Sequence, residues 1–271
     1  MPELPEVETT VRGLARFLDG ERIVRAAVNR PDMRRPFPVD LVQALTGARV
    51  TGLSRRAKYG LIHTDRARSI IFHLGMSGRW RIDPAAPDKH DHFVIETADH
   101  QFALCDPRRF GWVDLIDTAS LDSWPSFAAM GPEPLGPGLT AQHLRAAFKD
   151  RKQAIKLLLL DQRIVAGLGN IYVCEALFRA RIRPDKPAGK VSRLALGRLV
   201  PAIREVLLQS IEDGGSSLRD YARPDGELGY FATRFDVYGR EGEACKRGDE
   251  GAVRRIVQGG RSTWYCPKCQ T

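Results

Sequence analysis

The segment Gly131-Pro132-Glu133-Pro134-Leu135-Gly136-Pro137-Gly138 separates a part of the chain with strand-like patterns from a part with helical periodicity. Three prolines and three glycines in eight residues can neither continue a helix nor form a central strand, because proline lacks the amide hydrogen that both structures use. We therefore predict an interdomain linker at residues 131–138 and a first domain over residues 1–130. The length of 271 residues allows about two domains, each large enough to bury a core.

The first domain begins with a helical pattern and continues with short strands. Apolar residues recur at helical spacing from Val7 to Leu18, and Pro5 suits the first turn. Alternating runs separated by turn residues follow at 22–28, 59–64, 69–74, 93–97, 102–105 and 111–116. Such runs are typical of antiparallel strands, so we expect a β-sandwich with an N-terminal helix.

The second half of the chain has helical periodicity. Apolar residues return at helical spacing at 144–148, 155–159 and 171–178. A longer stretch runs from Ser192 to Glu212, and Pro201 inside it is expected to kink or divide the helix. We assign residues 139–233 to a helical domain.

The C-terminal residues 234–271 are rich in glycine and cysteine and too few to form a core unaided, which favours a bound metal. Cys266-Pro267-Lys268-Cys269 is a CxxC knuckle, and Cys245 lies upstream at a spacing typical of a zinc ribbon. We predict a structural Zn²⁺ site. The same residues also allow a metal-free hairpin with three free thiols.

The fourth ligand of this site is not a cysteine. A second CxxC would end at position 248, which is Gly248, and no histidine follows His143. Asp249 is the best remaining candidate, with Glu250 and Glu243 behind it, because carboxylate oxygen binds Zn²⁺.

The charge of the chain indicates an anionic partner. Lys and Arg number 42 against 33 Asp and Glu, which gives a formal charge of +9. Residues 251–271 contain four of these cations and no carboxylate. This charge fits a nucleic acid, although a basic run is also often only a solvated face.

The N-terminus is a second candidate site. Met1 precedes Pro2, a small residue of the kind from which an initiator methionine is removed. The freed imino group would be partly neutral near pH 7, since an α-amino group has a pKa of roughly 7.7–8.0, and could attack an aldehyde-like carbon. Glu3 and Glu6 lie beside it and could donate or relay protons. Taken alone, these residues also fit an ordinary chain start.

A third candidate site lies between two helical patterns, at Ala166-Gly167-Leu168-Gly169-Asn170. Glycine there allows backbone N–H groups to approach an anion, and Lys152 and Lys156 precede it at helical spacing. A simple packing corner between two helices is the alternative interpretation.

We expect a soluble, cytoplasmic protein. No apolar run approaches the roughly 18 residues that a membrane span needs, and the first eight residues carry three glutamates where a secretory signal needs positive charge.

Together, these segments resemble the formamidopyrimidine-DNA glycosylases, a bacterial family that repairs 8-oxoguanine. The resemblance covers nearly the whole chain and is carried by the segments 1–9, 56–59, 73–78, 89–92, 106–111, 167–172 and 259–263, which read MPELPEVET, RAKY, HLGMSG, KHDH, DPRRFG, GLGNIY and GGRST.

The resemblance implies an α+β fold with a β-sandwich, a helix–two-turn–helix domain and a zinc-finger hairpin. It also implies that Pro2 is the Schiff-base nucleophile, that Glu3 is a proton donor, and that Lys58 and Arg261 serve β- and δ-elimination. Met76, Arg108 and Phe110 would fill the duplex when the damaged base is flipped out. The implied phosphate contacts are His90, Lys152, Lys156 and Asn170. Residues 216–230 resemble a loop that covers the everted base.

One departure from the family pattern concerns the zinc finger, because the family has four cysteines and Asp249 stands where the second belongs. We therefore predict one Zn²⁺ bound by Cys245, Asp249, Cys266 and Cys269. The expected partner is double-stranded DNA with oxidised bases or abasic sites, bound by a monomer associated with the nucleoid. The alternatives are an endonuclease VIII-type glycosylase for oxidised pyrimidines and a non-catalytic zinc-ribbon protein.

Overall fold

The computed structural model describes residues 2–216, 224 and 229–271. It consists of two compact units: one is formed by residues 1–128 with 211–232, and the other by residues 129–210 with 233–271. Within the described residues, no helix has both the length and the apolar character needed to cross a membrane.

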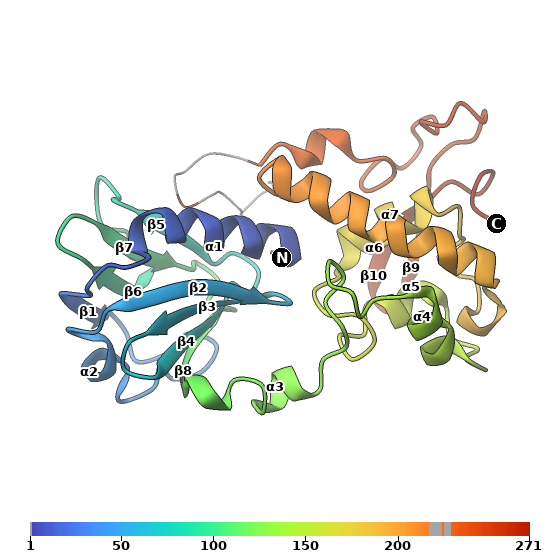
Figure 1. Cartoon of the computed structure of the whole chain (residues 1–271). Coiled ribbons are helices and arrows are strands. Elements are labelled where there is room, and N and C mark those ends of the chain that lie inside the picture. The colour runs from blue at the N-terminus through green and yellow to red at the C-terminus, as the bar shows by residue number, and fades with distance from the viewer. Residues whose placement is uncertain (1, 217–223, 225–228) are drawn as a thin grey trace. The chain divides into compact units, whose positions relative to one another are not determined.

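The first unit contains a short-strand sandwich and the helices attached to it (Figure 1). Its elements are α1 (Leu4–Leu18), β1 (Arg25–Val28), α2 (Leu41–Leu45), β2 (Val50–Arg56), β3 (Tyr59–Thr64), β4 (Arg68–His73), β5 (Arg79–Ile82), β6 (Asp91–Glu96), β7 (Gln101–Cys105), β8 (Trp112–Asp117), η1 (Thr118–Ser120) and α3 (Pro125–Ala128).

Two antiparallel four-stranded sheets, in the orders β1-β6-β7-β5 and β2-β3-β4-β8, form the sandwich. Their inner faces share one hydrophobic core, in which Phe72 of one sheet packs edge-on against Trp80 of the other at 5.5 Å between ring centroids. Helix α1 adds Val7, Leu14 and Leu18 to this core. The predicted sandwich with an N-terminal helix is confirmed.

The second unit contains the helices and the C-terminal hairpin. Its elements are α4 (Ala141–Phe148), α5 (Ile155–Leu159), α6 (Asn170–Arg179), η2 (Ala188–Lys190), most of α7 (Arg193–Glu212), η3 (Phe231–Arg234, which begins in the first unit), β9 (Arg254–Gln258) and β10 (Arg261–Tyr265). Helix α6 is almost entirely buried, because α5 and β10 both pack against it.

Helix α7 runs undivided through Pro201 (Figure 1), so the expectation that this proline divides the helix is wrong. Proline removes one hydrogen bond from a helix interior. Pro201 lies on the exposed side, where water can satisfy the carbonyl of Gly197 that loses its partner. Leu196, Leu199 and Ile203 pack on the buried side and hold the helix together across this position.

Candidate functional site

The candidate nucleophile lies at the positive end of α1. Pro2 is buried directly before Glu3, the N-cap of this helix. The Glu3 N–H donates to Oε2 of Glu6 at 2.8 Å, and the Glu3 side chain accepts from the Glu6 N–H, so the two residues form a capping box. This reciprocal pair fixes the backbone that follows Pro2.

The second carboxylate oxygen of Glu6 reaches a distant segment of the first unit. Oε1 accepts from both the N–H and the hydroxyl of Ser216, each at 2.8 Å. Glu3 and Glu6 are 3% and 2% exposed, so both carboxyl groups are shielded from water. Ser216 begins the predicted loop 216–230, of which residues 217–223 and 225–228 lie outside the described residues.

Lys58 lies in the tight turn that joins β2 to β3. The turn has two residues, Ala57 and Lys58, and Ala57 adopts a φ of +53°. A left-handed alanine costs on the order of 1 kcal/mol, so this conformation needs support from its surroundings. Arg55 supplies it by donating to the Ala57 carbonyl and to the Glu8 carboxylate, each at 2.9 Å. The result is a buried lysine, 8% exposed, on a fixed backbone.

His73, at the end of β4, was given no role by the sequence analysis. Its ring stacks on Trp112 and lies 5.1 Å from the ring of Tyr59. Burial lowers the pKa of His73 to about 4, and the nearby Lys58 cation acts in the same direction. The imidazole is therefore neutral near pH 7. Because its Nδ1 accepts from the Gly75 N–H at 3.1 Å, its proton lies on Nε2.

Met76, Arg108 and Phe110, which are predicted to fill the duplex, lie on two loops that pack directly against each other. A side chain on Gly75 would collide with the backbone of Phe110, so the loop carrying Met76 lies directly against the loop carrying Arg108. Phe110 is 42% exposed, which is unusual for phenylalanine, and the Arg108 guanidinium lies 4.8 Å from its ring centroid. The arrangement presents an apolar wedge beside a cation.

A buried carboxylate joins these two loops. Asp106 is fully buried and accepts from the Ser77 hydroxyl at 2.6 Å and from the Gly111 N–H at 2.7 Å. Its own N–H donates to the carbonyl of His90 at 3.0 Å. The structure therefore places His90, a predicted phosphate contact, next to the loops that carry Met76 and Arg108.

Arg261 is exposed at the start of β10, directly after the turn of the C-terminal hairpin. The turn consists of Gly259 and Gly260, both with positive φ, which is the requirement of a two-residue hairpin turn. Residues of the helical part support the same strand. Nζ of Lys156 donates to the Thr263 hydroxyl at 2.6 Å and to the Ser262 carbonyl at 3.3 Å.

Asn170 and Lys152 are the two other phosphate contacts predicted for the second unit. Asn170 begins α6, and its Nδ2 donates to the Ser262 carbonyl at 2.9 Å. Lys152 is exposed shortly before α5. Lys156, by contrast, is fully buried, so its hydrogen bonds within the protein hold the hairpin.

Glu175 is a second important residue that the sequence analysis missed. It is fully buried on α6, and its carboxylate accepts three backbone N–H groups, from Asp236, Val237 and Tyr238, at 2.8–3.0 Å. Burial raises its pKa, and the three N–H bonds partly offset this effect. A single carboxylate therefore fixes the segment that leads into the hairpin.

We expect Glu175→Ala to lower the free energy of unfolding by about 3 kcal/mol, since it leaves three backbone N–H groups, one buried and two partly buried, without an acceptor. The measurement is denaturant unfolding. Glu205→Ala is the matched control, because this carboxylate is 58% exposed and its ion pair with Arg179 contributes about 0.5 kcal/mol. Equal stability of the two variants would contradict the role of Glu175.

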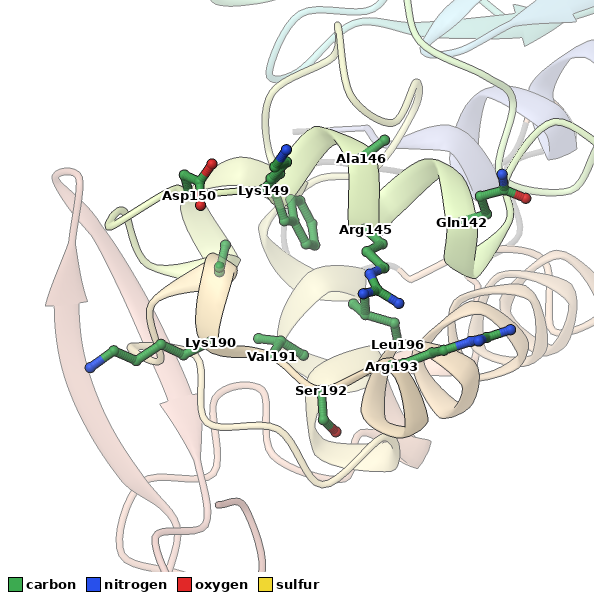
Figure 2. A pocket seen from close by; sticks show the side chains of 13 residues that line it. Gln142, Arg145, Ala146, Lys149, Asp150, Lys190, Val191, Ser192, Arg193 and Leu196 are labelled. Carbon is green, nitrogen blue, oxygen red and sulfur yellow. The ribbon is translucent and has the colours of Figure 1, made fainter.

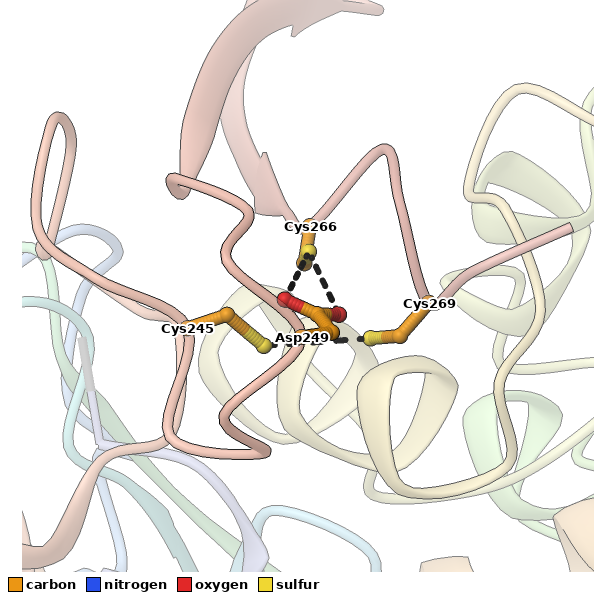
Figure 3. Close-up of side chains that lie close together, drawn as sticks. All are labelled: Cys245, Asp249, Cys266 and Cys269. Atoms are coloured by element: carbon orange, nitrogen blue, oxygen red, sulfur yellow. Dashed lines mark hydrogen bonds between the residues drawn. The ribbon is translucent and has the colours of Figure 1, made fainter.

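The four predicted metal ligands meet in one cluster (Figure 3). Their ligand atoms lie within 4.8 Å of one another. The sulfur atoms of Cys245 and Cys269 are 3.9 Å apart, and the Cys266 sulfur lies 3.4 Å from Oδ2 of Asp249. Tetrahedral Zn²⁺, with its usual bond lengths, requires about 3.8 Å between two sulfurs and about 3.5 Å between sulfur and oxygen. The donor set fits one structural zinc ion.

Gly251 provides an independent test of the fit. A Cβ at this position would lie 2.8 Å from Oδ1 of Asp249 and 2.9 Å from the sulfur of Cys266, so the backbone closely lines the ligand atoms. The Gly251 N–H also donates to Oδ1 of Asp249 at 2.9 Å. Although desolvation opposes it, this hydrogen bond helps to hold the Asp249 pKa below its ordinary value, so the carboxylate is ionised for a cation.

The cluster also supports its surroundings. Cys245, Cys266 and Val253 pack with Cys174 and Phe178 of α6 in a small hydrophobic core. The metal site therefore connects the hairpin that carries Arg261 to the helix that carries Glu175.

The sequence of modules agrees with three family models. The N-terminal domain of formamidopyrimidine-DNA glycosylase matches residues 1–113, its H2TH domain matches residues 130–222, and the zinc finger found in FPG and IleRS matches residues 251–271. Fold and modules define a zinc-finger DNA glycosylase.

The chain is also similar in sequence to curated proteins over its full length. Formamidopyrimidine-DNA glycosylases of Erythrobacter litoralis and Novosphingobium aromaticivorans are 75% and 71% identical, and each alignment covers 100% of both chains. The MutM (Fpg) protein of Thermus thermophilus superimposes with a TM-score of 0.89 at 37% identity, covering 99% of this chain and 98% of the other. The chain belongs to the formamidopyrimidine-DNA glycosylase family.

Proposed function

We propose that the protein removes oxidised purines, such as 8-oxoguanine and formamidopyrimidines, from double-stranded DNA and then cleaves the strand at the abasic site. The observation that carries this proposal is the position of Pro2 at the capped start of α1, with the carboxyl groups of Glu3 and Glu6 buried beside it. A free imino group there would be partly neutral near pH 7 and could act as a nucleophile in a site shielded from water.

In the proposed first step, the Pro2 nitrogen attacks C1′ of the damaged nucleotide, and the bond from C1′ to the base breaks. The base leaves with the bonding electrons, and the proton that the Pro2 nitrogen loses balances the charge of the departing base. Glu3 gives a proton to the ring oxygen as the sugar opens, and the product is an iminium ion. Glu6 fixes the backbone of Glu3 and contacts Ser216, so it is a positioning residue for this step.

The iminium ion is an electron sink for the elimination steps. Loss of a proton from C2′ expels the 3′ phosphate, with Lys58 in the assisting role. A second elimination expels the 5′ phosphate, with Arg261 in that role. The zinc ion would have a structural part only, because its proposed ligands fill four positions and leave none open for substrate.

The proposed DNA contacts fall into two groups, residues that fill the duplex and residues that contact phosphates. Met76, Arg108 and Phe110 would fill the space of the flipped nucleotide, and His90, Lys152 and Asn170 would contact phosphates. Since Lys156 is fully buried, we propose that it acts by holding Ser262 and Thr263 beside Arg261. The neutral His73 is a further proposed phosphate donor through Nε2.

The substrate class is supported by what relatives bind. A structure of Lactococcus lactis Fpg that superimposes on this chain with a TM-score of 0.91, at 35% identity, contains DNA with an abasic site. A structure of a mutant of the same protein, with a TM-score of 0.92 and 35% identity, contains DNA with Fapy-dG. We propose that this chain acts as a monomer on chromosomal DNA in the cytoplasm.

The test compares two duplexes, one with 8-oxoguanine opposite cytosine and one with thymine glycol. We expect excision and strand cleavage to be faster on 8-oxoguanine. Faster cleavage of thymine glycol would instead indicate an endonuclease VIII-type activity, and no nicking of an abasic duplex would indicate a protein that only binds DNA.

Binding to DNA is expected to weaken steeply with salt. If about three to five phosphates are neutralised, affinity should fall about 40- to 500-fold between 50 and 200 mM salt, because condensed counterions are released on binding. Fluorescence anisotropy with an uncleavable abasic analogue measures this slope. A flat dependence would contradict the proposed phosphate contacts.

A further inference from the structure

A cavity of about 720 Å³ lies in the second unit, between α4, the turn η2 and the start of α7 (Figure 2). Its volume falls within the range of sites that hold small ligands or side chains of a partner, roughly 300–1,000 Å³. The residues that line it include none of the proposed catalytic, DNA-contacting or metal-binding residues. The glycosylase reaction therefore does not explain it.

The walls of this α4–α7 pocket are fixed by the backbone. The N–H of Gly189 in η2 donates to the Arg151 carbonyl at 2.9 Å, and the Arg151 N–H donates to the Phe148 carbonyl at 3.1 Å. Behind these bonds, Phe148, Ala188 and Leu196 are each about 1% exposed. A ligand would meet a preformed site, so little ordering of the pocket would oppose binding.

The rim of the pocket is strongly cationic. Arg145, Lys149, Lys190 and Arg193 line it against one carboxylate, Asp150. All four cations are exposed, and within the described part of the chain none of them forms an ion pair. In Figure 2, Arg145 extends from α4 toward the start of α7, while Lys190 and Arg193 extend outward on opposite sides. Such an uncompensated rim attracts an anionic partner.

The shape and lining of the pocket distinguish between anionic partners. A duplex is convex and presents phosphates without apolar groups, so it would leave the cavity unfilled. A nucleotide base would need a flat aromatic surface, but Phe148 is almost completely covered. The accessible apolar surface comes from Val191, Ala146 and the stems of the basic side chains, which suits an aliphatic side chain.

We propose that the α4–α7 pocket is a docking site for an acidic peptide segment of a partner protein. One or two aliphatic side chains of the peptide enter the cavity, and its carboxylates lie against Arg145, Arg193 and Lys149. This site is independent of DNA cleavage, and it would bring the enzyme to a protein that carries such a segment.

The test uses a fluorescein-labelled peptide of four aspartates followed by two leucines, with binding to the full-length protein measured by fluorescence anisotropy. We expect saturable binding. Arg145→Glu with Arg193→Glu should weaken binding about tenfold or more, since two attractive charges become repulsive. The matched control is Arg16→Glu with Arg66→Glu, which changes the net charge equally on exposed positions of the first unit. It should leave the peptide affinity within about twofold.

Two further measurements make the result specific. A peptide with serines in place of the leucines should bind about tenfold more weakly, because aliphatic burial is lost. Cleavage of 8-oxoguanine DNA by the Arg145/Arg193 variant should be unchanged, and its melting temperature should match that of the parent.

The proposal is overturned if no saturable binding is found, if both double variants weaken it equally, or if the serine peptide binds as well as the leucine peptide. It is also overturned if the Arg145/Arg193 variant loses DNA affinity while the peptide fails to bind, because the pocket would then belong to the DNA surface. None of these outcomes bears on the Pro2 reaction, so the two proposals fail separately.

Discussion

Protein that keeps any residue in front of Pro2 is expected to form no borohydride-trapped adduct with 8-oxoguanine DNA, whereas the mature chain should form it readily. An additional residue converts the imino nitrogen into an amide, whose lone pair is delocalised and cannot attack C1′. We expect the loss to exceed about a thousandfold, the magnitude seen when a covalent nucleophile is removed.

The structure adds a reason why a neighbouring group would not replace Pro2. The Glu3 backbone N–H is held by Glu6, and both carboxyl groups are buried. Lys58 is an amine that is held on a fixed turn with restricted exposure. Glu3 and Glu6 cannot form the adduct in place of the terminal nitrogen, because neither a carboxyl group nor a backbone amide forms an iminium ion.

The matched control carries the same added residues at the C-terminus, where Thr271 is exposed. Both proteins should bind an uncleavable abasic analogue and melt at the same temperature. Full adduct formation by the blocked protein, with mass spectrometry showing that the added residues remain, would contradict the N-terminal mechanism.

Asp249→Ala is expected to lose the zinc ion, which the parent should hold at about one equivalent per chain. With one ligand removed, three thiolates remain, and the affinity should fall about 100-fold or more. Because binding of structural zinc contributes about 10 kcal/mol or more to the folding of such small units, the hairpin should then lose its fixed structure. DNA affinity should fall with it, since the hairpin carries Arg261.

Two variants control for charge and donor type. Glu250→Ala removes a neighbouring carboxylate that is exposed and, among the described residues, forms an ion pair only with Lys268 at 3.2 Å, so zinc content should not change. Asp249→Cys creates a four-thiolate site and should retain zinc longer against a chelator. Elemental analysis gives the stoichiometry, and the visible absorption of the Co²⁺-substituted protein reports how many thiolates bind.

Unchanged zinc content in Asp249→Ala would contradict this ligand set. Loss of zinc from Glu250→Ala but not from Asp249→Ala would indicate that the neighbouring carboxylate is the fourth ligand. The family match of the zinc finger begins at residue 251, after Cys245 and Asp249, so the experiment tests the part of the site that this match does not cover.

Much of the fold was predictable because its signals are local. Six of the eight sandwich strands were expected, while β2 and β5 were missed. Strand β2 contains only one fully buried residue, Val50, so it shows no regular alternation of apolar and polar side chains. Strand β5 alternates polar and apolar residues but is only four residues long, and such a short alternation is weak evidence for a strand; β1 is equally short but lies in a longer predicted run.

The continuity of α7 through Pro201 was not predicted, for a different reason. The effect of Pro201 depends on which side of the helix faces water, and that is decided by packing rather than by the residue itself.

The amino-acid sequence determined the modules and the three cysteine ligands, because such groups are recognised by residue type and short spacing. The choice of Pro2 as nucleophile, and of Asp249 over Glu250 and Glu243 as fourth ligand, came from the resemblance to the family. Only the tertiary structure showed the contacts of Glu6 with Ser216, of Glu175 with residues 236–238, and the neutral state of His73. The physical reason is that burial and hydrogen bonds join residues far apart in the chain, up to 210 positions for Glu6 and Ser216. No local pattern encodes such a pair, so a folded backbone is needed to bring its two members together.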